Sequence, residues 1–271
     1  GIQEGRFLDD RWAEAICCRM AGTYFEALEQ YEADDPACPE CWVRSFDLSL
    51  ERGTNFLQDA LLGMNAHINY DLTLATRDTL ARFDDLTPDA GGDPVDRVLG
   101  RRLKRRYHDY LLINDVAWEA IPLIQDVMTD RYSRLVGVLN RLSFRISRAF
   151  MEKVIMEYRD RSWGHVLLLG SMEDEDRKRL FRSFMDLHAS RNIRRIMSAL
   201  SWNPVVVARE AVRGFPLGGL DPERPEVRSV STLLVEELAD PRMSAHAHRA
   251  LEEYGAAAEP PLIDALETGE T

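Results

Sequence analysis

Hydrophobic residues recur along most of this chain at steps of three or four, the spacing that places side chains on one face of an α-helix. The first segment predicts an amphipathic helix over residues 7–33, whose inner face contains Trp12, Ile16, Met20, Tyr24, Leu28 and Tyr31. The same period predicts helices over residues 42–50, 54–82, 94–128, 131–142, 143–171 and 174–200, and a short one ending at Gly214. No segment alternates as a strand does, so we expect an all-α fold, with a multi-helix bundle over residues 1–214.

The C-terminal part of the chain differs from the bundle. Residues 215–225 carry enough Pro and Gly to predict a linker, and three short helices are expected after it, over residues 226–238, 242–254 and 260–266. The last two resemble a single HEAT-type repeat. One repeat cannot bury its own apolar face. We therefore expect this small HEAT-like helical cap, residues 226–271, to dock on the bundle, on a second copy or on a partner chain.

A proline interrupts the helix predicted over residues 94–128. Pro122 is expected to kink it, because proline lacks a backbone donor and clashes with the carbonyl of Trp118. A kink opens space between helices. Trp118 either lines a ligand cavity in that space or simply fills the gap.

Composition limits the partners of the protein. The chain has 271 residues, 45% of them hydrophobic, and 34 Lys and Arg against 46 Asp and Glu give a net charge of −12. This charge repels phosphate backbones, so we expect no nucleic-acid partner. No apolar run approaches the roughly 18 residues of a spanning helix, so we expect no membrane span. The N-terminus shows no secretory signal, and a cytoplasmic protein is expected.

Four cysteines, Cys17, Cys18, Cys38 and Cys41, all lie in the first 41 residues. The CxxC pair of Cys38 and Cys41 is compatible with zinc binding or redox chemistry. The second half of a zinc pattern is missing, however, and no strand precedes the pair. We therefore expect reduced thiols, as in most cytosolic proteins.

Four polar side chains interrupt the apolar helix around residues 61–76. His67 and Asp71 are four residues apart and are predicted to stack on one face, while Asn65 and Asn69 stack on another. Buried polar groups must be hydrogen-bonded. Either the carboxylate orients the imidazole for acid–base chemistry or metal binding, or the polar network fixes the register of the packed helices.

Three segments carry a family resemblance: the GMNAHINYDL helix, the Ile113–Asp115 tripeptide and the Arg159–Trp163 segment. Together with a tail similar to NPVVVAREAVRGF, they make residues 20–236 resemble a bacterial all-helical family of unknown function with a GMNAHIN-x-DL signature helix. The resemblance implies a single bundle and singles out Asn65, His67, Asn69 and Asp71, but it implies no reaction. The HEAT-like cap lies outside it.

Metal sites in helical bundles use Glu and Glu-x-x-His pairs from facing helices. The available residues are His67, Asp71, Asp115, Glu119, Glu157, Asp160 and His165, and their helices contain no Glu-x-x-His. We therefore predict no cofactor. A metal ion held by His67, Asp71, Asp115 and Glu119 is the alternative.

Two charged runs favour solvated surfaces. Residues 84–89 (DDLTPD) resemble the aspartate-rich motif of diphosphate-binding isoprenoid enzymes, but the following Ala-Gly-Gly-Asp-Pro is typical of a loop. The basic run over residues 101–106 predicts a solvated helix face, or an anion-binding patch together with Arg194 and Arg195. His108 and His188 are expected at the surface.

These patterns lead to one hypothesis and two alternatives. The hypothesis is a small-molecule enzyme with a mostly apolar cavity inside the bundle, acting on a small apolar or amphiphilic molecule by isomerisation, cyclisation or hydrolysis. His67 would be the base and Asp71 its orienting carboxylate, with polar positioning groups Asn65, Asn69 and Asp115 and substrate-binding residues Met64, Tyr107, Trp118 and Trp163. The first alternative is a binding or scaffold protein with a structural dyad, whose cap binds a protein partner or another copy. The second is a metal-dependent bundle enzyme.

Overall fold

The computed structural model describes residues 5–51, 54, 56–83, 102–113, 119, 158–199 and 225–239, and single positions at 244, 247, 248, 251, 252, 261 and 263. Every regular element in this part of the chain is helical, which confirms the all-α prediction. None of its helices is long and apolar enough to cross a membrane. The predicted loop over residues 84–89, the Pro122 kink and the predicted linker lie outside the described residues.

The chain divides into two compact units. One contains Gly1–Cys18 and Thr79–Tyr158, and the other contains Arg19–Asp78 and Arg159–Thr271. Helices α1 (Asp10–Glu32) and α4 (Leu72–Arg82) each contribute to both. The sequence-based division into residues 1–214, 215–225 and 226–271 stays a prediction.

In the first unit, two buried or half-buried side chains hold the start of α1. The Asp109 carboxylate accepts the backbone N–H groups of Leu8 at 2.7 Å and Asp9 at 2.9 Å. Arg106 pairs with Asp9 at 2.7 Å, and its guanidinium lies over the ring of Trp12 at 5.4 Å. The prediction of a solvated basic face is therefore wrong for Arg106, because its guanidinium packs on an aromatic ring and pairs with a carboxylate.

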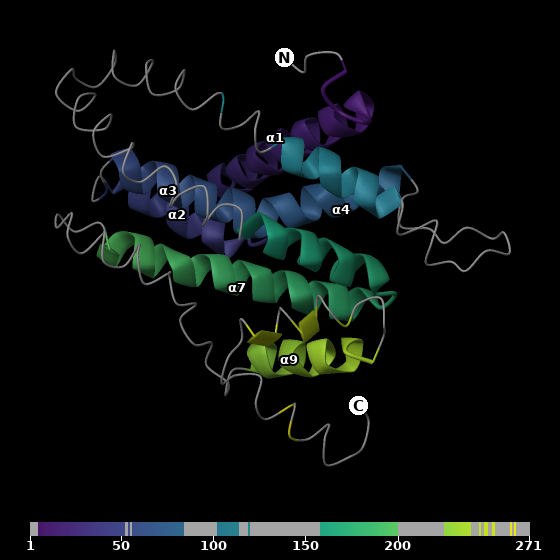
Figure 1. Ribbon diagram of the computed structural model, residues 1–271. Coiled ribbons are helices and arrows are strands. Elements are labelled where there is room, and N and C mark those ends of the chain that lie inside the picture. The colour runs from purple at the N-terminus through teal and green to yellow at the C-terminus, as the bar shows by residue number, and fades with distance from the viewer. Residues whose placement is uncertain are drawn as a thin grey trace, which may run out of the picture. The chain divides into compact units, whose positions relative to one another are not determined.

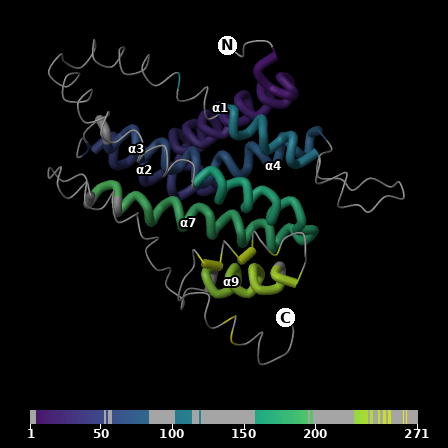
Figure 2. The backbone as a smooth tube through the Cα atoms, in the orientation of Figure 1, coloured from purple at the N-terminus to yellow at the C-terminus, as the bar shows by residue number. Residues whose placement is uncertain are grey.

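The second unit is built around helix α7 (Glu175–Ala199). Helices α2 (Glu40–Leu50) and α3 (Phe56–Ala66) pack against α7, and α9 (Pro225–Glu237) packs on its other side (Figures 1 and 2). Residues 158–171 form a further helix that ends just before α7. Asp174 caps α7, because its Oδ1 accepts the N–H of Asp176 at 2.7 Å.

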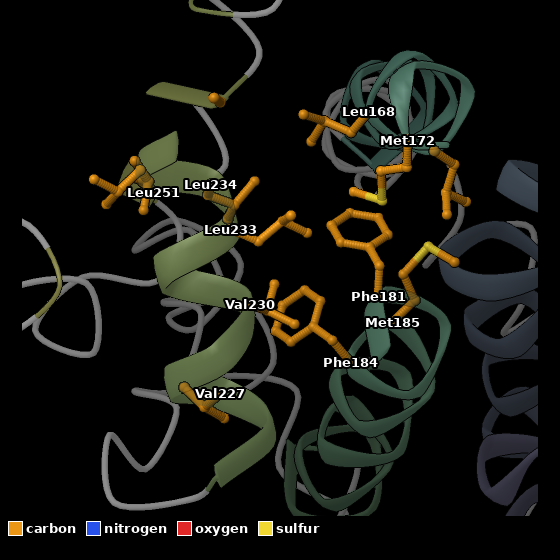
Figure 3. Close-up of a cluster of buried hydrophobic side chains, with 13 residues drawn as sticks. Leu168, Met172, Phe181, Phe184, Met185, Val227, Val230, Leu233, Leu234 and Leu251 are labelled. Carbon is orange, nitrogen blue, oxygen red and sulfur yellow. The ribbon is translucent and has the colours of Figure 1, made fainter. Parts of the chain in front are cut away.

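A hydrophobic cluster joins α9 to α7. Val230 and Leu233 of α9 point toward Phe184 and Phe181 of α7, and Leu234 is also fully buried in the cluster (Figure 3). The first helix of the predicted cap thus docks on the bundle. Ala247 and Leu251 belong to the same buried cluster. The HEAT-type pairing of the later helices stays a prediction, because most of their residues lie outside the described part.

The helix predicted over residues 54–82 contains an interruption. It begins at Phe56 instead of at Thr54, and a π-helical turn, η1 (His67–Asp71), separates α3 from α4. A π turn amounts to one extra residue inside a helix. Hydrophobic periodicity averages over three or more turns, so the sequence pattern could not reveal it.

We expect Leu234→Ala to lower the free energy of unfolding by about 2–5 kcal/mol, because it empties a fully buried site between α9 and α7. Urea unfolding monitored by circular dichroism measures this change. Ser229→Ala is the matched control, since Ser229 is exposed on the same helix. An equally small effect of both substitutions would contradict the packing of α9 on α7.

Candidate functional site

The π turn η1 carries the pair of residues predicted to act together. His67 is its first residue and Asp71 its last. The His67 Nδ1 atom lies 2.9 Å from Asp71 Oδ2, as their spacing of four residues predicted. The two side chains differ in exposure: 34% of the His67 side chain is accessible to solvent, against 3% of the Asp71 side chain. The carboxylate therefore lies in the protein interior, and the imidazole reaches the surface.

Helix α2 supplies a second donor to the buried carboxylate. The indole Nε1–H of Trp42 points at both oxygens of Asp71, at 3.2 Å and 3.1 Å. Burial raises the pKa of Asp71 above its ordinary value, while the hydrogen bonds from His67 and Trp42 act in the opposite direction. The Thr23 hydroxyl of α1 is a further donor to Asp71. Donors from different helices thus hold the carboxylate, which in turn holds one nitrogen of the imidazole.

Aromatic rings surround the indole of Trp42. Its ring centroid lies 5.3 Å from that of Tyr24 and 5.2 Å from that of Phe46, and Tyr31 packs on Phe46 at 4.9 Å. The imidazole of His67 meets the indole edge-on, with centroids 6.3 Å apart. The polar pair is thus bordered by a cluster of large apolar rings from α1 and α2.

The two asparagines lie on a different face, as predicted. Asn69 Nδ2–H donates to Asn65 Oδ1 at 2.9 Å, and Asn65 Nδ2–H donates to the carbonyl of Ala189 on α7 at 2.8 Å. The buried Asn69 Oδ1 atom has no hydrogen-bond partner among the described residues. These contacts attach α3 and the π turn to α7. The structure does not bring either asparagine into the hydrogen bonds of Asp71.

The other predicted site residues are distributed over the chain. Met64 is half-buried on α3 and Trp163 is buried in the helix over residues 158–171, both in the unit that holds the dyad. Tyr107 belongs to the other unit, where it stacks on Tyr110. Asp115 and Trp118 lie outside the described residues.

Two of the other residues proposed as metal ligands have partners of their own, and Glu157 lies outside the described part, as Asp115 does. Glu119 pairs with Arg6, which lowers the pKa of its carboxyl. His165 is buried edge-on against Phe181, and burial lowers its pKa to about 3. Within the described ranges, no three His, Cys, Asp or Glu side chains come together as a metal site.

The CxxC pair forms no disulfide, and both of its thiols are buried. Burial raises the pKa of Cys38, and burial together with the Asp186 carboxylate raises that of Cys41 well above its ordinary value. Thiols are reactive as thiolates. The raised pKa values therefore favour a packing role for both thiols.

Sequence reasoning missed two residues that shape the site, Trp42 and Asp186. Asp186 of α7 accepts the first backbone N–H groups of α2, from Glu40 and Cys41, both at 2.8 Å. It replaces the N-cap side chain that Pro39 cannot provide, and thereby places Trp42. Because these contacts join residues 29 and 145 positions apart, no local pattern could have indicated them.

The ionised Asp71 carboxylate should destabilise the fold relative to its protonated form. A group whose pKa is raised by folding stabilises the protein below its unfolded pKa, and this stabilisation is lost as pH rises through the folded value. Asn cannot ionise. We therefore expect the wild type to lose unfolding free energy relative to Asp71→Asn over the pH range that begins near 4, about the ordinary pKa of an aspartate, and extends upward through the raised pKa of the folded protein.

Urea unfolding across this range measures the difference. Glu252→Gln serves as the control, because Glu252 is exposed and lies four residues after His248 in a similar pair. A difference between wild type and Asp71→Asn that does not change with pH would contradict the effect of burial.

Comparisons with known proteins give one match. Neither the curated proteins nor the solved structures contain a match to this chain. The model of a family of unknown function, DUF5995, matches residues 1–199, which begins earlier and ends earlier than the range that the sequence resemblance indicated. The signature helix, the π turn and the helix over residues 158–171 all lie within the match. Since this match covers well over half of the chain, the protein belongs to the DUF5995 family of unknown function.

Proposed function

We propose that this protein is a small-molecule enzyme in which His67 acts as a general acid–base group oriented by Asp71. One observation carries the proposal: His67 Nδ1 is bound to a buried carboxylate, while the imidazole remains one-third exposed. Within the described part of the chain, the second ring nitrogen, Nε2, has no hydrogen-bond partner. Nε2 is therefore available to a substrate.

The carboxylate gives the imidazole a defined role. In the neutral ring, an Nδ1–H that donates to Asp71 leaves the lone pair on Nε2. When Nε2 accepts a proton from substrate or water, the buried carboxylate stabilises the imidazolium that forms. The Trp42 indole holds the carboxylate in place during this change, because it donates to both oxygens. The same pair can return the proton in a later step.

The surroundings of the dyad favour a substrate that is largely apolar. The indole of Trp42 meets the imidazole edge-on, the rings of Tyr24 and Phe46 pack on that indole, and Phe25 is 57% exposed beside Tyr24. Apolar and aromatic side chains with few polar groups are the usual lining of small-molecule sites. Isomerisation, cyclisation and hydrolysis each need only a proton acceptor and donor, and these are the reaction classes that we propose.

The competing interpretation is that the dyad serves only to pack the helices. It predicts that removal of His67 leaves Asp71 with one donor fewer and lowers stability by roughly 1–3 kcal/mol, with no effect on any reaction. The exposure of the imidazole favours the catalytic interpretation, because a purely structural donor gains nothing from access to solvent. Activity and stability therefore have to be measured on the same variants.

The proposal can be tested without knowledge of the natural substrate. We expect the wild type to hydrolyse p-nitrophenyl esters of medium-length acyl chains, and His67→Ala to lower the rate by about 10²- to 10⁴-fold. Asp71→Asn should lower it by about 10- to 100-fold, because the imidazole is then less well oriented.

His248→Ala is the matched control, since His248 lies 3.4 Å from Glu252 at the same spacing of four residues but is 70% exposed. It should leave the hydrolysis rate unchanged. Equal rates in wild type and His67→Ala, across esters of different chain length, would contradict the assignment of His67.

A second measurement reports on the imidazole itself. Diethyl pyrocarbonate acylates neutral imidazoles, and mass spectrometry gives the rate at each histidine. We expect the rate at His67 to fall several-fold in Asp71→Asn. The rate at His248 should not change in Glu252→Gln, because an exposed pair contributes little in water. No change at His67 would remove Asp71 from the proposed mechanism.

A further inference from the structure

The Arg159–Trp163 segment contacts the GMNAHINYDL helix at the π turn. Ser162, within the Arg159–Trp163 segment, donates its hydroxyl to the carbonyl of Ile68 at 2.8 Å. Ser162 is buried in the helix over residues 158–171, and Ile68 is the second residue of η1. Two segments 94 positions apart thus meet at the turn that carries the dyad.

The backbone of the turn explains why a donor is useful there. In an α-helix, the N–H of Leu72 would donate to the carbonyl of Ile68, four residues earlier. In this structure the Leu72 N–H donates to the carbonyl of His67, five residues earlier. The Ile68 carbonyl therefore loses its α-helical donor, and the Ser162 hydroxyl provides a hydrogen bond to it.

The direction of this bond sets Ser162 apart from other buried serines. The hydroxyls of Ser45 and Ser231 donate to carbonyls of their own helices, those of Cys41 and Val227. The hydroxyl of Ser162 reaches the carbonyl of another helix. A hydrogen bond between helices at the π turn favours that turn over a regular helix.

The shape of the turn determines the geometry of the dyad. His67 and Asp71 are the two ends of η1, so the path of the backbone between them sets the distance from Nδ1 to Oδ2. We propose that Ser162 is a positioning residue of the active site, which holds the π turn and thereby keeps the imidazole and the carboxylate in contact. This inference rests on the proposed function, because it assigns Ser162 to that same dyad.

Ser162→Ala tests the proposal through His67 itself. We expect the rate of His67 acylation by diethyl pyrocarbonate to fall several-fold, toward the value in Asp71→Asn. Backbone amide chemical shifts of residues 67–72 should change at the same time, because the Leu72 N–H returns toward the Ile68 carbonyl. Ser162→Thr keeps the hydroxyl and should restore both readouts.

Ser231→Ala is the matched control. It removes a buried hydroxyl from a helical carbonyl far along the chain from the dyad, so it should lower stability to a similar degree without affecting His67. If Ser162→Ala does not fold, Ser162→Cys replaces it, because the thiol has nearly the same shape but is a weak donor. Ser162→Cys should then give an intermediate rate.

The outcomes separate the two proposals. If Ser162→Ala lowers stability as Ser231→Ala does, but leaves the His67 rate and the shifts of residues 67–72 unchanged, Ser162 is only a packing residue and the inference is wrong. If Asp71→Asn leaves the His67 rate unchanged, the proposed function fails first, and the inference that depends on it fails as well. A change in shifts without a change in the His67 rate also contradicts the positioning role.

Discussion

A carboxylate buried in a helical bundle has to be compensated by donors, and this requirement organises the part of the protein around Asp71. Its donors include the imidazole one turn earlier, the indole of α2 and the Thr23 hydroxyl of α1. The indole is in place only because α2 starts where Asp186 of α7 receives its first N–H groups. A series of hydrogen bonds thus connects α7 to the start of α2, Trp42 of α2 to Asp71, and Asp71 to His67.

Helix α7 takes part in most of these contacts. One side of it accepts Asn65 through the Ala189 carbonyl, and another buries Phe181 and Phe184 against α9 (Figure 3). A helix packed on several sides has little freedom to shift without disturbing all of its neighbours. The residues that it positions around Asp71 are therefore held by packing that lies well away from the dyad itself.

The sequence predicted the features that depend on neighbouring residues. Hydrophobic spacing located α1, α2 and α7 to within a few residues, and the spacing of four between His67 and Asp71 predicted their contact. Features that depend on distant residues could not be predicted. These include the cap that Asp186 supplies to α2, the hydrogen bond from Trp42 to Asp71 and the ion pair of Arg106 with Asp9. Each of them follows from packing between segments.

The family resemblance indicated which segments are notable, but not the structural reason for them. It marked the signature helix and the Arg159–Trp163 segment as notable, but it gave no reason for either. The contact between Ser162 and Ile68 provides one, since it joins the two segments through a single hydrogen bond. The π turn itself has no signature in a pattern of residue types, because it concerns the number of residues in a turn.

The additional residue in the π turn η1 has a consequence for the helix that follows it. Each residue of an α-helix rotates the following side chains by about 100°. If η1 took the form of a regular α-helix with the same number of residues, everything after it would turn about the helix axis, so that Thr73, Ala75 and Leu80 would leave their buried positions. The π turn thus accommodates one additional residue between Ala66 and Leu72 while α4 keeps its buried face. The packing of α4 therefore depends on the backbone form of this segment as well as on its residue types.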